Sequence, residues 1–169
     1  MNPQVSIIMG SLSDMPVMEE AARFLEQMEI PFEINALSAH RTPDKVADFA
    51  RNASKRGVRV IIAGAGGAAH LPGVIAAYAD VPVIGVPVKS SNSLAGLDSI
   101  LSILQMPSGI PVATMALDGA RNAAIFAAGI LALGNEELAG RMKSFRSSLT
   151  RKVEEANESI KKIQYRFKI

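Results

Sequence analysis

The sequence of 169 residues contains no cysteine, so disulfide bonds, thiolate metal sites and cysteine nucleophiles are excluded. It contains two histidines, His40 and His70, which are too few for most structural zinc sites. We therefore expect no bound metal.

Other absences limit the partners of the protein. There is no tryptophan and aromatic residues make up 5% of the chain, so platforms for stacking nucleobases are not expected. The net charge of +2 is too small to indicate nucleic acid or an anionic membrane. No run approaches the roughly 20 apolar residues of a membrane-spanning helix, and residues 5–9 are too short for a signal-peptide core. We expect a cytoplasmic protein.

Apolar residues make up 49% of the chain, and they occur in short runs that alternate with helical patterns. The runs predicted as strands are residues 5–9, 32–37, 58–63, 81–88 and 111–115. Near-continuous apolar strands separated by helices are typical of a parallel sheet covered on both faces. We predict an α/β fold, a three-layer αβα sandwich of the flavodoxin-like, doubly wound type with strand order 2-1-3-4-5.

Helix signals lie between these runs. Met18, Ala21, Ala22 and Leu25 have the spacing of one helix face, and so do Leu97, Ile100, Leu101 and Leu104. Thr42 and Pro43 are suited to the start of a helix, with Thr42 as its cap, and Gly57 is expected to end it. Residues 120–133 predict a helix of small side chains.

The C-terminal segment has apolar residues at steps of three and four from Leu138 to Ile163. A helix over residues 136–163 would be roughly 42 Å long, which exceeds the width of a small domain. We therefore divide the chain into an α/β domain, residues 1–134, and a helical extension, residues 135–169, that packs partly on neighbouring subunits. The alternative is a helix folded wholly onto its own domain.

Residues 63–73, AGAGGAAHLPG, contain a Gly-x-Gly-x-x-Ala pattern that resembles a dinucleotide-binding fingerprint. That fingerprint needs an acidic residue about 20 positions further on, after the next strand, but residues 85–89 are GVPVK. No Gly-Lys-Ser/Thr sequence follows, so a P-loop is excluded too. We expect no nucleotide cofactor, and we interpret Gly66, Gly67 and Ala68 as backbone left bare so that a flat ring can approach.

In strand order 2-1-3, the loops that follow the first three strands are neighbours, and ligands of doubly wound sheets bind there. These loops are GSLSD at residues 10–14, SAHRT at residues 38–42 and the stretch over residues 64–73. Both histidines of the chain lie on this edge.

Charge and hydrogen-bonding capacity predict roles for these side chains. The guanidinium of Arg41 suits a phosphate, and Ser11 and Ser13 beside a helix start also favour an anion. Asp14 would accept hydrogen bonds from ribose hydroxyls, and His40 suits general acid and base catalysis because imidazole titrates near neutral pH. A nucleotide monophosphate satisfies all of these groups.

Simpler explanations remain open for some of these residues. Ser13 or Asp14 can serve only as a helix cap. His70, beside Leu71, can be a structural histidine that bonds the backbone. His40 has the stronger functional case because it lies between Ser38 and Arg41 on a strand-end loop.

Four motifs, GSLSD at 10–14, SAHRTP at 38–43, residues 63–73 and QMP at 105–107, resemble the N5-carboxyaminoimidazole ribonucleotide mutase (PurE-type) family of purine biosynthesis. The likeness runs in order over about residues 5–133. It implies an isomerase that moves a carboxylate from N5 to C4 of an aminoimidazole ribonucleotide, giving the 4-carboxy product on the route to IMP. It also implies that the reaction needs no cofactor.

The resemblance carries site residues with it. His40 matches the family's acid/base histidine, which acts as CO2 is released and recaptured. Ser11, Asp14 and Arg41 match residues that bind ribose and phosphate, and Ser38 would assist. The glycine-rich loop with His70 would cover the ring and retain CO2. Family members are homo-octamers with sites near subunit boundaries.

Two alternatives remain. A related branch carboxylates aminoimidazole ribonucleotide directly with free CO2, although residues 66–73 resemble the mutase branch. The other alternative is a non-catalytic, flavodoxin-like module that binds a mononucleotide and tolerates loss of His40.

Overall fold

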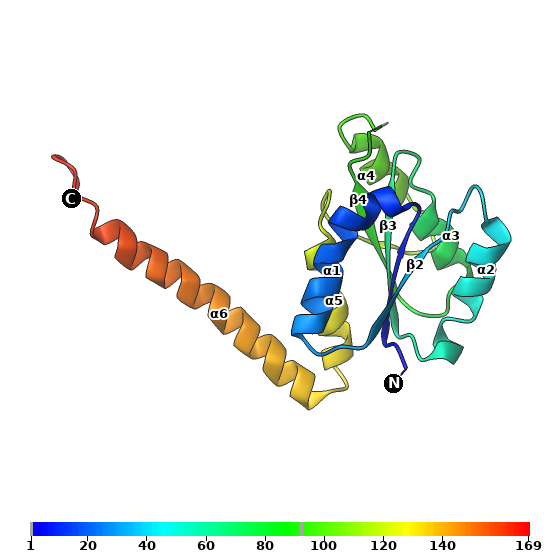
Figure 1. Ribbon diagram of the computed structural model, residues 1–169, viewed down its shortest axis with the longest axis horizontal. Coiled ribbons are helices and arrows are strands. Elements are labelled where there is room, and N and C mark those ends of the chain that lie inside the picture. The colour runs from blue at the N-terminus through cyan, green and yellow to red at the C-terminus, as the bar shows by residue number, and fades with distance from the viewer. Residues whose placement is uncertain (1, 92) are drawn as a thin grey trace.

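A computed structural model describes residues 2–91 and 93–169 of the chain. Its strands form one parallel sheet in the order β2-β1-β3-β4-β5, which confirms the predicted topology (Figure 1). The strands are β1 (Val5–Met9), β2 (Phe32–Ala36), β3 (Val60–Gly66), β4 (Val83–Val88) and β5 (Ala113–Thr114).

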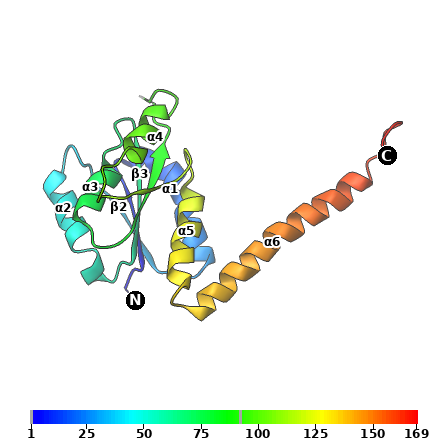
Figure 2. The same ribbon diagram turned by 180° about the vertical axis from the view of Figure 1, so that it is seen from behind.

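Helices cover both faces of the sheet, as Figures 1 and 2 show from opposite sides. The helices are α1 (Met15–Gln27), α2 (Pro43–Arg51), α3 (Leu71–Tyr78), α4 (Leu97–Leu104), α5 (Ala120–Ala132) and α6 (Glu136–Lys161), with 3-10 turns η1 (Leu12–Asp14) and η2 (Ser54–Arg56). One apolar cluster joins α1, α5 and the start of α6 to the sheet, and the other joins α2, α3 and α4 to its opposite face. The three-layer αβα prediction is therefore confirmed.

The position of the central strands between two helical layers explains why their sequences are almost continuously apolar. Val60 and Ile62 of β3 belong to the first cluster, whereas Ile61 and Ala63 belong to the second. A strand between two helical layers has no solvent face, so it cannot carry polar residues at alternate positions. The edge strands β2 and β5 are only partly buried, as expected for strands with one free side.

The second helix and the third strand have different bounds from those expected. Helix α2 ends at Arg51, and the separate turn η2 then leads to Gly57, whose φ of 95° ends that turn in the left-handed conformation. Strand β3 continues to Gly66, because its pairing with β4 extends to Val88. The first residues of the glycine-rich stretch therefore belong to the sheet.

The apolar face predicted for α4 is largely exposed in the single chain. Leu97, Leu101 and Leu104 are exposed, whereas Ser99 and Ile103 are buried against the sheet. Ser99 is held there because its hydroxyl donates to the carbonyl of Val88 at 3.1 Å. The leucines of α4 thus leave an apolar surface on the outside of the domain.

The C-terminal helix α6 begins on the domain and then leaves it (Figure 1). Leu138, Met142 and Phe145 are buried, and the Phe145 ring packs edge-on against Phe24 of α1 with centroids 5.0 Å apart. From Leu149 onward the large apolar side chains are exposed. With 26 residues, α6 is about 39 Å long. Within the described residues, no helix combines the length and apolar character that crossing a membrane requires.

Candidate active site

The loops after β1, β2 and β3 meet at the carboxyl edge of the sheet and enclose a cavity of about 330 Å³. A fourth segment, after β4, adds Ser90 to its wall. The cavity is lined by Gly10, Ser11, Ser13, Asp14, Ser38, Ala39, His40, Arg41, Ala65, Gly66, Ala68, His70, Leu71 and Ser90. Of the residues predicted for the site, Gly67 alone is absent from this lining.

The two histidines are directly joined. Nε2 of His40 lies 2.8 Å from Nδ1 of His70, and the two rings are nearly perpendicular, at 85°. One nitrogen must donate and the other accept, so the two rings are joined by one N–H···N hydrogen bond in the cavity lining. His70 therefore bonds the other imidazole, which is a different partner from the backbone group considered in the sequence.

The loop that carries His40 and Arg41 is closed on itself. The Ser38 N–H donates to Oγ1 of Thr42 at 3.0 Å, and that hydroxyl donates in turn to the Ser38 carbonyl at 3.0 Å. The Arg41 N–H donates to Oγ of Ser38 at 3.2 Å. Thr42 precedes α2, but its side chain makes no cap bond to that helix, contrary to the sequence prediction. Its hydroxyl bonds backward and fixes the loop instead.

Arg41 is exposed, and no carboxylate in residues 2–91 or 93–169 forms a salt bridge with it. Arg41 lines the cavity together with both histidines. A planar, fully charged fork at this position is suited to two parallel hydrogen bonds with a phosphate.

The loop after β1 places a carboxylate in the cavity wall. Asp14 is 6% exposed, and this burial raises its pKa, while hydrogen bonds from Ser11, Ser13 and Gly10 act in the opposite direction. Asp14 stands at the N-terminus of α1 without a side-chain cap bond, whereas the hydroxyl of Ser11 caps η1 by accepting from the Ser13 N–H at 3.4 Å. Capping therefore accounts for Ser11 but not for Asp14.

The glycines at the end of β3 and in the loop that follows it are required by close packing and by the backbone conformation. A Cβ on Gly64 would lie 2.4 Å from Sδ of Met18, and one on Gly66 would lie 2.7 Å from the Ser90 side chain. Gly67 is buried and has a φ of 59°, which turns the chain after β3. Close packing and a turn thus explain this bare backbone, whereas the sequence interpretation relied on the approach of a flat ring.

Ser90 was not among the predicted site residues. It follows β4, whose carboxyl end lies at the same edge as the other three loops. Asp118 fixes this segment by accepting from the Lys89 N–H at 2.9 Å, and the Ser93 N–H donates to the Ser90 carbonyl at 3.1 Å. The signal was available, because extending the strand-end rule from three strands to four would have included it.

Metal ligation finds little support in these side chains. No group of three or more His, Asp or Glu side chains among the described residues is arranged to hold a metal ion. The chemistry of the cavity is that of an imidazole pair, one guanidinium, one buried carboxyl group and several hydroxyls.

Comparison with known proteins places the chain in one family. Residues 4–152 match the family model described as AIR carboxylase. The chain is 58% identical over 153 residues to the N5-carboxyaminoimidazole ribonucleotide mutase of Pyrococcus horikoshii, which covers 90% of this chain and 86% of that protein. The crystal structure of a variant of PurE2 from Treponema denticola superimposes with a TM-score of 0.85 at 32% identity, covering 96% of this chain and 100% of that one.

A fungal relative has a different name. The phosphoribosylaminoimidazole carboxylase of Schizosaccharomyces pombe is 50% identical over 165 residues, which cover 98% of this chain but 30% of that protein. The chain therefore corresponds to one part of a much longer enzyme in that organism.

Proposed function

We infer that this chain, which belongs to the AIR carboxylase family, is an N5-carboxyaminoimidazole ribonucleotide mutase of purine biosynthesis. The observation that carries this conclusion is its 58% identity to the mutase of Pyrococcus horikoshii over 86% of that protein. The reaction is an isomerisation, in which the bond from N5 to the carboxylate breaks and a bond from C4 to the same carbon forms.

The reaction requires a proton to be moved as well as a carboxylate. When CO2 leaves, the N–C bonding electrons stay on N5, which takes up a proton. When the C4 carbon then attacks CO2, C4 loses its hydrogen as a proton. We assign both transfers to His40, which is first the acid and then the base. The 2.8 Å contact with His70 supports this assignment, since a hydrogen bond to the second imidazole orients the His40 ring for both transfers.

The phosphate and the ribose of the substrate need different binding groups: a cation and hydrogen-bond donors for the phosphate, and a hydrogen-bond acceptor for the ribose hydroxyls. We assign the phosphate to Arg41 and to the hydroxyls of Ser11 and Ser13, and the ribose hydroxyls to Asp14. The exposed guanidinium in the same cavity as a buried carboxyl group supports this division. Ser38 would assist through the Arg41 backbone, to which it is hydrogen-bonded.

Released CO2 has to remain beside the ring until C4 attacks it. If CO2 escaped, the second step would become bimolecular and lose the rate advantage of proximity. We propose that Gly66, Ala68 and His70 form the part of the wall that retains it. Their place in a cavity of about 330 Å³ supports this proposal.

The apolar surfaces outside the domain support an assembly, for which we propose a homo-octamer in the cytoplasm. Leu97, Leu101 and Leu104 on α4 are exposed, as are Leu149 and the large apolar residues that follow it on α6. Monomeric proteins rarely expose contiguous apolar surface of this kind. In this proposal residues 1–134 form the catalytic domain, and the extension over residues 135–169 reaches neighbouring subunits.

The first test is the conversion of N5-carboxyaminoimidazole ribonucleotide in CO2-depleted buffer by the wild type and by His40→Asn. We expect the wild type to form the 4-carboxy product rapidly and the variant to lose most of its turnover, about 100-fold or more. Calorimetry with aminoimidazole ribonucleotide should show that the variant still binds the nucleotide.

Other outcomes select between the alternatives. Product that forms only after bicarbonate is added would identify a direct carboxylase, which the name of the Schizosaccharomyces pombe relative makes the second candidate. No product in either condition, with nucleotide binding intact, would leave a mononucleotide-binding module. Equal turnover in the wild type and His40→Asn would contradict the acid/base assignment.

A further inference from the structure

The two helices that follow the catalytic loops form a pair. Helices α2 and α3 lie side by side on one face of the sheet (Figures 1 and 2). His70 immediately precedes α3, and His40 lies in the loop just before α2. The hydrogen bond between the two imidazoles therefore joins the N-terminal ends of the two helices.

The same two helices are also joined at their far ends. The guanidinium carbon of Arg51, the last residue of α2, lies 4.4 Å from the ring centroid of Tyr78, the last residue of α3. Just beyond the helices, Oγ of Ser54 donates to Oδ2 of Asp80 at 2.8 Å. We call these two contacts, Arg51–Tyr78 and Ser54–Asp80, the distal link.

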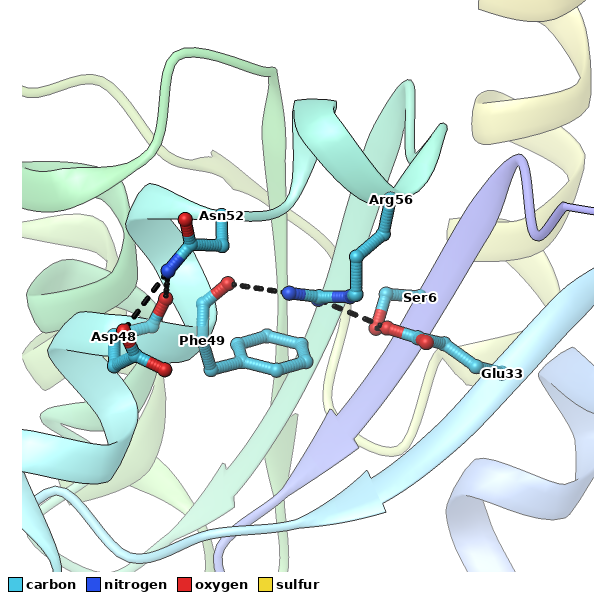
Figure 3. Close-up of polar contacts among 6 residues, drawn as sticks. All are labelled: Ser6, Glu33, Asp48, Phe49, Asn52 and Arg56. Atoms are coloured by element: carbon cyan, nitrogen blue, oxygen red, sulfur yellow. Dashed lines mark hydrogen bonds and ion pairs between the residues drawn. The ribbon is translucent and has the colours of Figure 1, made fainter.

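Helix α2 is in addition fixed to the sheet, as Figure 3 shows. Arg56 donates to the Phe49 carbonyl at 3.1 Å and to Oε1 of Glu33 on β2 at 3.0 Å. Glu33 also accepts from Oγ of Ser6 on β1 at 2.9 Å. Arg56 therefore connects α2 to β1 and β2, whereas α3 packs on the sheet through the buried side chains of Leu71 and Ile75. The distal link then fixes the far ends of α2 and α3 relative to each other.

We propose that Arg51, Tyr78, Ser54 and Asp80 are positioning residues that hold His70 in hydrogen-bonding distance of His40. Helices of nine and eight residues are about 13 Å and 12 Å long, and a tilt of about 5° at one end moves the other by about 1 Å. Adding 1 Å to the 2.8 Å contact would break the hydrogen bond. The consequence for turnover rests on the proposed function, whereas the consequence for the imidazole contact does not.

The test uses substitutions at the distal link in the full-length protein. Tyr78→Leu with Asp80→Ala removes both contacts, and since Tyr78 is 43% exposed its loss opens no buried cavity. We expect kcat for the mutase reaction to fall about tenfold while KM stays within about twofold, because the acid/base pair is displaced and the nucleotide contacts are not. Partial unfolding would also lower the apparent kcat without changing KM, so kcat is calculated from the concentration of folded protein, measured by circular dichroism.

Matched variants serve as controls. Tyr78→Phe keeps the ring beneath Arg51, and Asp80→Asn keeps an acceptor for Ser54, so each should retain the wild-type kcat. Ile30→Val lowers stability from the opposite face of the sheet, where Ile30 is buried, and should leave kcat unchanged.

The second measurement does not depend on activity. The chain contains two histidines, so 15N-histidine labelling reports only these two rings in the NMR spectrum. We expect Nε2 of His40 and Nδ1 of His70 to shift toward free-imidazole values in the double variant, and to keep wild-type values in Tyr78→Phe.

Two results would overturn the inference: wild-type nitrogen signals in the double variant, whatever its kcat, or shifted signals with an unchanged kcat. If the wild type itself forms no product, the mutase assignment fails. In that case the nitrogen signals alone decide whether the distal link holds the imidazoles together.

Discussion

At the scale of single residues, Asp14 lies in an environment that disfavours its charge. Burial raises its pKa above the ordinary 3.8, because a carboxylate loses water contacts when it is enclosed. The folded protein therefore binds the proton of Asp14 more tightly than the unfolded chain does. Its contribution to stability is greatest below pH 3.8 and is lost as the pH rises through the higher value in the folded state.

Asp14→Asn should separate stability from binding. The amide carries no charge, so the variant should gain stability relative to the wild type as the pH rises above 3.8 and keep that gain at neutral pH. Its affinity for aminoimidazole ribonucleotide should fall by about tenfold or more, since hydrogen bonds to a charged acceptor are worth about 1.5–3 kcal/mol. Urea unfolding at several pH values and titration calorimetry measure the two effects. A variant less stable than the wild type at neutral pH would contradict the predicted gain.

At the scale of elements, the site depends on how closely β3 and β4 approach at their carboxyl ends. Gly66 closes β3 opposite Val88, and the Ser90 side chain occupies the space where a Cβ on Gly66 would lie. Side-chain packing between two strand ends therefore decides which residues face the cavity. The Ser38–Thr42 loop reaches the same edge by a different means, through hydrogen bonds between its own residues.

Gly66→Ala should disturb this junction. A new Cβ would lie 2.7 Å from Oγ of Ser90 and 3.0 Å from the Val88 carbonyl, so one strand end must move. We expect a loss of about 1–3 kcal/mol in unfolding free energy and a lower kcat/KM. Gly140→Ala is the control, since a Cβ there meets no atom within 4 Å and alanine stabilises a helix interior by about 0.5–1 kcal/mol. Equal stability in the two variants would show that the junction can relax without cost.

At the scale of the whole molecule, the chain exposes more apolar surface than its own domain can cover. Helix α6 extends away from the sheet (Figure 1), and its large apolar residues from Leu149 to Ile160 are exposed beyond the buried start that holds Leu138 and Phe145. A helix of this kind gains most of its stability from packing rather than from intrinsic propensity. Association with other copies would supply that packing.

Deletion of residues 150–169 should therefore lower the mass of the assembly, as measured by light scattering. In the full chain, Val153→Ser with Ile160→Ser should have the same effect, because both side chains belong to the apolar stripe and are more than half exposed. Arg151→Ser with Glu158→Ser is the matched control, since it breaks only exposed ion pairs of little energetic value. An unchanged mass in the truncated and apolar variants would refute the role of the stripe.

Much of the fold and most of the cavity lining could be predicted from the sequence, because periodicity and strand order are local signals with a global consequence. The apolar runs at residues 5–9 and 81–88 predict buried parallel strands, and the strand-end rule then brings His40, Arg41 and His70 to one edge.

Only the tertiary structure decided how those residues meet. No spacing in the sequence indicates that Nε2 of His40 bonds Nδ1 of His70, that Thr42 bonds backward to Ser38, or that Gly66 makes room for Ser90. Each of these contacts would be altered by a change of a few tenths of an ångström in the distance between two segments, and that distance is fixed by packing elsewhere. Sequence periodicity identifies which face or edge a residue occupies, and packing alone sets the distance to its neighbour.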